Sequence, residues 1–161
     1  NYNVVVGDEA GTAITTGDQN VAVGYLALST DTLGIGSVAV GIAALRNQNF
    51  TSATTTYNTA IGYDAGSSVT TGVNNTLIGG LAGDAITTGN NNSAVGYGSL
   101  GANTTGGNNV AVGNYALDAN TTASNNTAVG YASLGANTTG RDNTALGFSA
   151  GATGASPKYN G

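Results

Sequence analysis

The amino-acid sequence has no cysteine, histidine, methionine or tryptophan, and its single proline is Pro157. The lack of cysteine excludes disulfide bonds. The lack of both cysteine and histidine excludes the common pairs of nucleophile and general base, and it excludes metal sites built from thiolate or imidazole ligands. Asp8 and Glu9 are adjacent carboxylates, and one such pair is more typical of a solvated turn than of an active site. We therefore expect a protein that is not an enzyme and that uses no metal ion and no cofactor.

Charge is also scarce. Charged residues make up 7% of the chain, against about 25% in ordinary soluble proteins. The net charge is −5, and Arg46, Arg141 and Lys158 are the three basic residues. This excludes the basic patch that nucleic-acid binding requires. No apolar run approaches the roughly 20 residues of a membrane-spanning helix, so we expect no transmembrane segment in this chain.

What the sequence does contain is a repeat. An apolar triplet closed by a glycine recurs at intervals of 17 residues, with one interval of 21. The closing glycines, called here the key glycines, are Gly7, Gly24, Gly41, Gly62, Gly79, Gly96, Gly113, Gly130 and Gly147. The long interval contains an insertion, which we place at residues 46–57. Because the repeat fills the chain, we predict a single domain over residues 1–161.

The period and composition predict an all-β fold. Seventeen residues are too few for the helical hairpins of 33- to 34-residue repeats, and Thr, Asn, Val and Gly are poor helix formers. Short β-branched stretches between Gly and Asn turns favour strands. We predict a parallel β-solenoid of about nine 17-residue coils, each hydrogen-bonded to the next at a distance of about 4.8 Å.

Two positions of the repeat alternate between a large apolar side chain and a small or polar one, and this exchange of volume predicts the core. Four residues after each key glycine stands either Leu or Gly. Where it is Leu, the residue three positions later is polar; where it is Gly, that later residue is apolar, except at Gly154. We interpret both positions as filling one core slot per coil, because filling it twice would overpack the interior. We also expect a polar partner such as Asn137 to tolerate substitution better than Leu134. The predicted slot is filled by Ile14, Leu28, Leu45, Val69, Ile86, Leu100, Leu117 and Leu134.

The triplets themselves suggest an association between chains. Strand alternation places Thr127, Val129 and Tyr131 on one face and Ala128 and Gly130 on the other, and neither face is charged. A strand that is apolar or small on both faces is generally buried on both. We therefore predict that the small-residue face packs against other copies of the chain, most simply around a closed symmetry axis. This predicted oligomer face consists of Ala39, Ala60, Ala94, Ala111, Ala128 and Ala145.

The same residues carry a resemblance to a known family. The phrases Ser37-Val38-Ala39-Val40-Gly41 and Asn58-Thr59-Ala60-Ile61-Gly62 resemble the YadA-like head repeats of trimeric autotransporter adhesins, and related coils occur in phage tail fibres. The resemblance implies a left-handed β-roll and a side-by-side homotrimer at the outer end of a surface-anchored fibre. It therefore implies an extracellular protein of a cell surface or fibre, with a role in adhesion.

Two other functions remain open. Tyr2-Asn3 and Tyr159-Asn160 occupy the same phase of the repeat, which is compatible with head-to-tail stacking of subunits into an extracellular filament. Threonine pairs such as Thr70-Thr71 also recur at the repeat interval, and a regular row of hydroxyl groups could bind ice. Threonine also simply suits strands, so we rank the ice-binding solenoid last.

The insertion at 46–57 is the one departure from the 17-residue period. Solenoids carry insertions as loops, often on a binding face. Because this segment must bulge from its coil, we predict a ligand-contact loop with Arg46, Asn49, Phe50 and Tyr57 as the contact residues. The expected partner is a surface receptor or a glycan.

Overall fold

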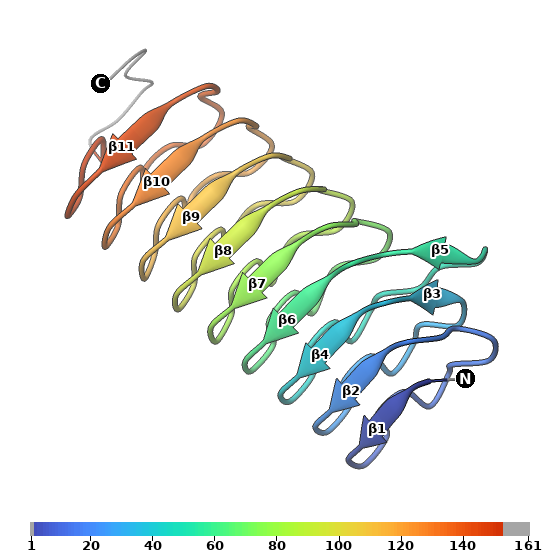
Figure 1. The fold of residues 1–161 in the computed structure, drawn as a ribbon. Coiled ribbons are helices and arrows are strands. Elements are labelled where there is room, and N and C mark those ends of the chain that lie inside the picture. The colour runs from blue at the N-terminus through green and yellow to red at the C-terminus, as the bar shows by residue number, and fades with distance from the viewer. Residues whose placement is uncertain (1, 153–161) are drawn as a thin grey trace.

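The computed structural model describes residues 2–152, and in that range the chain winds into a rod of stacked coils (Figure 1). One short strand of each coil joins a nine-stranded parallel sheet, and no helix occurs in the described part of the chain. The predicted all-β parallel solenoid is therefore confirmed. In spatial order the strands are β1 (Val4–Val6), β2 (Val21–Val23), β4 (Val38–Val40), β6 (Thr59–Ile61), β7 (Thr76–Ile78), β8 (Ser93–Val95), β9 (Val110–Val112), β10 (Thr127–Val129) and β11 (Thr144–Leu146).

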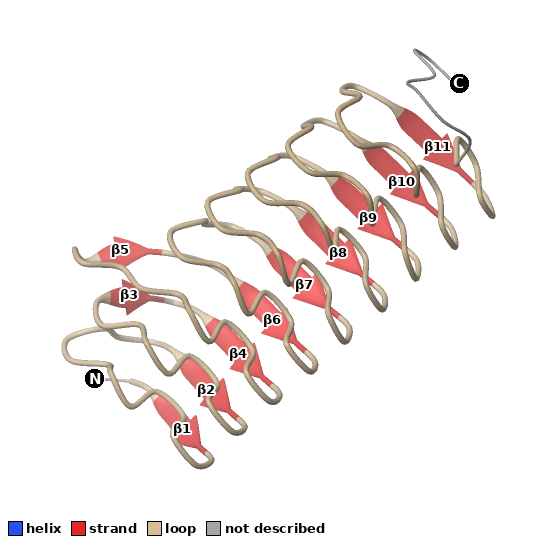
Figure 2. Cartoon of the chain, turned by 180° about the vertical axis from the view of Figure 1, so that it is seen from behind, coloured by secondary structure: helices blue, strands red, loops and turns tan. Residues whose placement is uncertain are grey.

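The register of the sheet follows the repeat. Residues 17 apart face each other, as in Ala111 and Ala128 of β9 and β10. Between β4 and β6 the offset is 21, with Val38 opposite Thr59. The four extra residues are accommodated on the opposite side of the coil, where β3 (Gly34–Ile35) and β5 (Thr54–Thr55) form a separate two-stranded parallel sheet (Figure 2).

The key glycines are required by close backbone contact. Their φ angles lie between +122° and +139°, a region that side chains disfavour. A Cβ atom on Gly79 would lie 2.6 Å from the carbonyl oxygen of Gly96 in the next coil, and one on Gly7 would lie 2.7 Å from that of Gly24. Backbone therefore rests directly on backbone where the chain turns out of each strand, and this contact explains why the glycine recurs at every coil.

The core slot lies inside the coil. Of its eight side chains, seven are fully buried and Ile14 packs against them half-buried. The exchange of volume is steric: a Cβ atom on Gly83 would lie 2.8 Å from Cδ1 of Ile86, and one on Gly11 would lie 3.1 Å from Cδ1 of Ile14. The apolar side chain in these coils occupies the space that a leucine fills in the others.

Leu77, two residues before the key glycine Gly79, also fills space that is left open where a coil has glycine in place of the core leucine. It stands where most coils have alanine, and it is fully buried. Cβ atoms on Gly66 and Gly83 would lie 2.6 and 2.8 Å from its two Cδ atoms. The larger side chain is therefore accommodated because two neighbouring coils lack a leucine at the glycine position.

The alternation between leucine and glycine also has a backbone cause. Leu28 and Leu117 have φ angles of 50° and 53°, and Gly66 and Gly83 at the same phase have 59° and 58°. The left-handed conformation costs a side-chain-bearing residue roughly 1–2 kcal/mol. Burial of a leucine, worth about 1.5–3 kcal/mol, offsets this cost.

A ladder of asparagines runs through the polar part of the interior. Asn92 is typical: its backbone N–H donates to Oδ1 of Asn75 (3.0 Å), and its Nδ2 donates to that Oδ1 (3.2 Å) and to the carbonyl oxygen of Gly106 (2.9 Å). No buried side-chain nitrogen or oxygen among the described residues lacks a partner. The ladder consists of Asn3, Asn20, Asn58, Asn75, Asn92, Asn109, Asn126 and Asn143, with Ser37 in place of asparagine in one coil.

The polar partners of the core leucines form a second buried row. Asn103, Asn120 and Asn137 are joined by Nδ2–Oδ1 hydrogen bonds, and Asn137 also bonds both the N–H and the carbonyl of Gly140. Asn137 is 5% exposed. Removal of its side chain would leave buried polar groups unpaired, so substitution of Asn137 has a cost of its own. That Asn137 tolerates substitution better than Leu134 stays a prediction.

Replacing Gly79 by alanine should destabilise the solenoid strongly, because backbone strain of about 1–3 kcal/mol adds to a clash with the next coil. Gly147→Ala is the matched control. Gly147 has a similar φ of 122°, but its Cβ would meet no atom within 4 Å in the described part of the chain. We expect urea denaturation to show a clearly larger loss for Gly79→Ala. Equal losses would mean that strain, not backbone contact, dictates the glycine.

The exchange of volume can be tested with a double-mutant cycle. Leu117→Gly should cost about 2–5 kcal/mol through loss of core packing. Adding Asn120→Ile in the same coil should recover part of this loss, because Leu117 and Asn120 then match the Gly83 and Ile86 pattern. The control combines Leu117→Gly with Asn137→Ile in the next coil, where Leu134 still fills the slot. Equal recovery in the two double variants would contradict a slot filled once per coil.

Candidate interaction surface

The two faces of the sheet are reversed relative to the expectation. The alanines predicted to form an oligomer face lie inside the coil, where Ala128 is fully buried by its own chain. The prediction of that face is therefore wrong. The physical reason is that the interior of the thin coil has room for a methyl group opposite the core slot and for little more. The residues concerned are Ala39, Ala60, Ala94, Ala111, Ala128 and Ala145, all at most 5% exposed.

The outward side of the sheet carries branched apolar side chains instead. The residue before each key glycine points away from the core, and central members such as Val95 and Val112 are 36% and 37% exposed. Nine coils at about 4.8 Å make this surface about 40 Å long. We call it the apolar face; its members are Val6, Val23, Val40, Ile61, Ile78, Val95, Val112, Val129 and Leu146.

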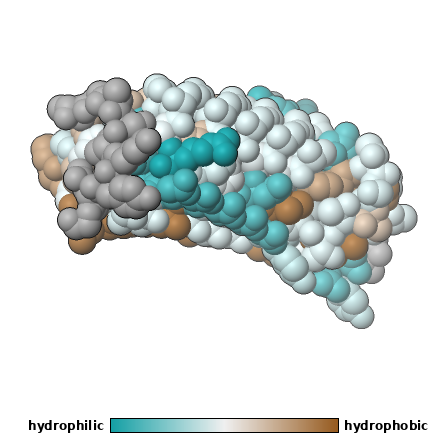
Figure 3. Space-filling view, turned by 90° about the horizontal axis from the view of Figure 1, so that it is seen from above, coloured by the Kyte–Doolittle hydropathy of each residue, from teal (hydrophilic) through white to brown (hydrophobic). Residues whose placement is uncertain are grey.

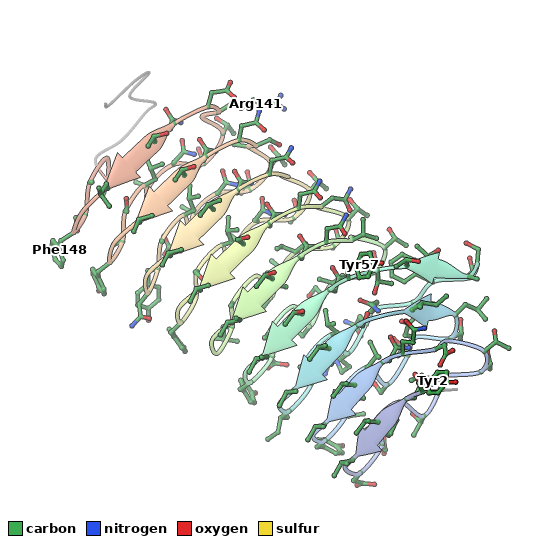
Figure 4. All side chains as sticks on the ribbon, in the orientation of Figure 1. Tyr2, Tyr57, Arg141 and Phe148 are labelled. Atoms are coloured by element: carbon green, nitrogen blue, oxygen red, sulfur yellow. The ribbon has the colours of Figure 1, made fainter. Side chains whose placement is uncertain are left out.

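A row of aromatic side chains follows the apolar face at the turn after the strands. The rings of Tyr97, Tyr115, Tyr131 and Phe148 form a chain of contacts, with centroid distances of 5.5, 6.1 and 5.3 Å. All four side chains are exposed. In Figure 4, Phe148 projects from the lower edge of the rod, away from the core. We call these four residues the aromatic row.

The opposite edge of the rod is polar. Figure 4 places Arg141 on that edge, and Figure 3 shows a band of hydrophilic residues along the top of the molecule. In the threonine pairs that precede Thr138, the hydroxyl of the first threonine is bonded, as in Thr87 Oγ1 donating to the carbonyl of Thr104 at 3.1 Å. The second threonines remain exposed and form one row: Thr71, Thr88, Thr105, Thr122 and Thr139.

The insertion does not form the predicted contact loop as a whole. Phe50 is 6% exposed, and its N–H donates to Oδ1 of the buried Asp31 at 3.1 Å. Its assignment as a ligand contact is therefore wrong, because the ring packs against the body of the solenoid. Asn49 and Tyr57 are exposed, while Arg46 is half-buried.

The interior of the insertion completes the asparagine ladder where Ser37 interrupts it. Gln48, fully buried, donates through Nε2 to Oδ2 of Asp31 (2.7 Å) and to Oγ of Ser37 (2.8 Å). Its Oε1 accepts from Nδ2 of Asn58 at 2.8 Å. The sequence analysis missed this network; the signal for it was the coincidence of the missing asparagine with the insertion.

A groove of about 320 Å³ opens beside the aromatic row, and the sequence analysis did not predict it. Its two acidic residues are Asp84 and Asp118. Burial raises the pKa of both carboxyl groups above the ordinary aspartate value, and the negative charge of Asp64 adds to the rise at Asp84. The groove is lined by Leu81, Asp84, Tyr97, Gly98, Gly101, Tyr115 and Asp118.

No protein-family model, curated protein or solved structure matches this chain. The described residues contain neither a helix that is long and apolar enough to span a membrane nor a group of three or more acidic residues placed to hold a metal ion.

The raised pKa of Asp84 predicts a pH-dependent effect of its removal. Burial disfavours the charged form in the folded state, so the contribution of Asp84 to stability is greatest below the ordinary aspartate pKa and falls as the pH rises through the raised value. Asp84→Asn should therefore raise the melting temperature at about pH 7 and change it little at about pH 3. Asp142→Asn, at an exposed site, is the control. A gain that persists at acidic pH would contradict this assignment.

Proposed function

We propose that this chain is a non-enzymatic structural module of an extracellular fibre, which associates side by side with identical copies and displays its polar edge for attachment. One observation carries the proposal: the apolar face runs the whole length of the described rod without an intervening charge. A monomer rarely exposes a contiguous apolar patch of more than a few hundred Å².

The symmetry of the rod favours identical partners. Every coil presents a Val, Ile or Leu before the key glycine, and a Val, Thr or Ser two positions earlier, at the same spacing, so a second copy placed parallel to the first meets a similar row at every step. Closed cyclic arrangements of such surfaces satisfy all copies equally. Three copies is the number implied by the resemblance to trimeric adhesin heads, and that resemblance is also the basis for an extracellular location at a cell surface or fibre.

The attachment surface is the polar edge and the exposed part of the insertion. Asn49 and Tyr57 remain accessible there, next to exposed asparagines such as Asn74 and Asn91. Neutral amide and hydroxyl groups suit hydrogen bonding to a glycan or a receptor surface. The alternative of head-to-tail filaments depends partly on Tyr159-Asn160, which lies outside the described residues.

An ice-binding solenoid is the second candidate, and the exposed row of threonines favours it. The row runs through consecutive coils from Thr71 to Thr139. The ice-binding hypothesis is weakened because the neighbouring hydroxyl groups, such as that of Thr104, donate hydrogen bonds to the next coil. One row of free hydroxyl groups offers less regular area than a flat array.

Mass measurement distinguishes these functions. Light scattering across dilutions should give a fixed trimer, and Val95→Lys with Val112→Lys should yield monomers because two charges would be desolvated at the contact. The matched control is Thr105→Lys with Thr122→Lys, which puts the same charges on exposed sites of the same two coils. It should remain trimeric.

Three results would contradict the fibre module. A wild-type monomer would remove the lateral association, and growth in mass with concentration would favour the filament. Thermal hysteresis that the threonine variant abolishes would favour ice binding. Circular dichroism of both variants verifies that the solenoid is intact.

A further inference from the structure

The groove beside the aromatic row arises from two glycines in one coil. Gly98 stands at the phase where the neighbouring coils have Leu81 and Tyr115, and Gly101 stands between Asp84 and Asp118. The middle coil therefore contributes a floor of bare backbone and the side chain of Tyr97, while the coils on either side supply the remaining lining residues. This combination of two glycines flanked by two aspartates occurs once in the sequence.

Two tyrosine rings form one wall. The rings of Tyr97 and Tyr115 lie 5.5 Å apart between centroids and are nearly perpendicular, at 79°. Tyr115 leans over the floor, since a Cβ atom on Gly98 would lie 3.1 Å from its Cδ1. The two rings give the groove an aromatic wall, and aromatic rings attract cations within about 6 Å of their centroids.

The two carboxylates lie at separate points along the groove. Oδ1 of Asp84 is 3.6 Å from the position that a Cβ atom of Gly101 would take, so this carboxylate leans over the floor. Asp118 is two coils from Asp84, which corresponds to about 10 Å between equivalent backbone atoms. Neither basic residue of the described chain, Arg46 or Arg141, lines the groove. Oδ1 of Asp118 leans the same way along the rod, 3.3 Å from the position that a Cβ atom of Gly135 would take in the coil beyond the groove. Two partly buried negative charges therefore line the groove, without a cation among its lining residues.

We propose that the groove binds an extended organic diammonium, such as a linear diamine or polyamine. One ammonium group bonds Asp84 and the other bonds Asp118, and the methylene chain lies over Gly98 and Gly101 against the tyrosine rings. A single metal ion does not fit the spacing, because calcium ligands lie about 2.3–2.6 Å from the ion. This binding goes beyond the proposed fibre function and does not depend on it.

Calorimetric titration of the intact chain at low salt tests the proposal with 1,5-diaminopentane as the probe. We expect saturable binding, and 1-aminopentane should bind at least about tenfold more weakly because it lacks one charge-assisted contact. Asp84→Asn and Asp118→Asn should each weaken diamine binding by a similar factor. Asp142→Asn makes the same change of charge at an exposed site outside the groove and should have no effect.

The aromatic contribution is tested separately. Tyr115→Ala should weaken binding of the diamine, while Tyr25→Ala, at an exposed tyrosine far along the rod, should not. The proposal is overturned if no heat of binding is detected, if the monoamine binds as tightly as the diamine, or if Asp142→Asn weakens binding as much as Asp84→Asn. Light scattering of each variant shows whether the association of chains has changed, so failure of this site and failure of the fibre function remain distinguishable.

Discussion

The solenoid depends on contact between the backbones of successive coils at the key glycines. A Cβ atom there would come within 2.6–2.7 Å of a carbonyl oxygen in pairs such as Gly79 and Gly96 or Gly7 and Gly24. This closeness fixes the coil spacing where each strand ends, and the spacing brings the asparagines, core side chains and tyrosines of adjacent coils into register. Every other regular feature of the rod follows from coils that are held at the same distance and rotation.

The interior shows how a chain with few large apolar residues can still fold. One leucine, isoleucine or valine per coil and one or two small residues, mostly alanine, make up much of the apolar core, and amide side chains occupy the remainder. Buried amides are costly unless all their hydrogen-bonding groups are satisfied. In this solenoid the next coil satisfies them, because an asparagine such as Asn92 bonds its equivalent 17 residues earlier. The polar ladder therefore works because the sequence repeats.

The sequence was sufficient to predict the all-β class, the parallel register and the filling of the core slot, because each leaves a trace at a fixed interval. It was not sufficient to predict which face of the sheet lies inside the coil. Ala128 and Val129 alternate identically whichever face is buried, and only the folded coil shows that Ala128 lies inside it. Phe50 was misassigned for a related reason. An aromatic residue in an insertion looks exposed until the fold brings a partner such as Asp31 to its backbone.

The coil with the insertion has a mechanical consequence. When the rod is pulled along its axis, the hydrogen bonds between coils carry the load in series, so the weakest junction opens first. At most junctions an asparagine repeats the bonds of its predecessor, but at Ser37 the connection passes through Gln48 and Thr56. That junction keeps the backbone pairing of the repeating phrase between β4 and β6, but its interior side-chain bonds come from a loop. Under tension, two runs of coils with the 17-residue period are therefore separated by one junction of different composition. The position of that junction is set by where the four extra residues were inserted.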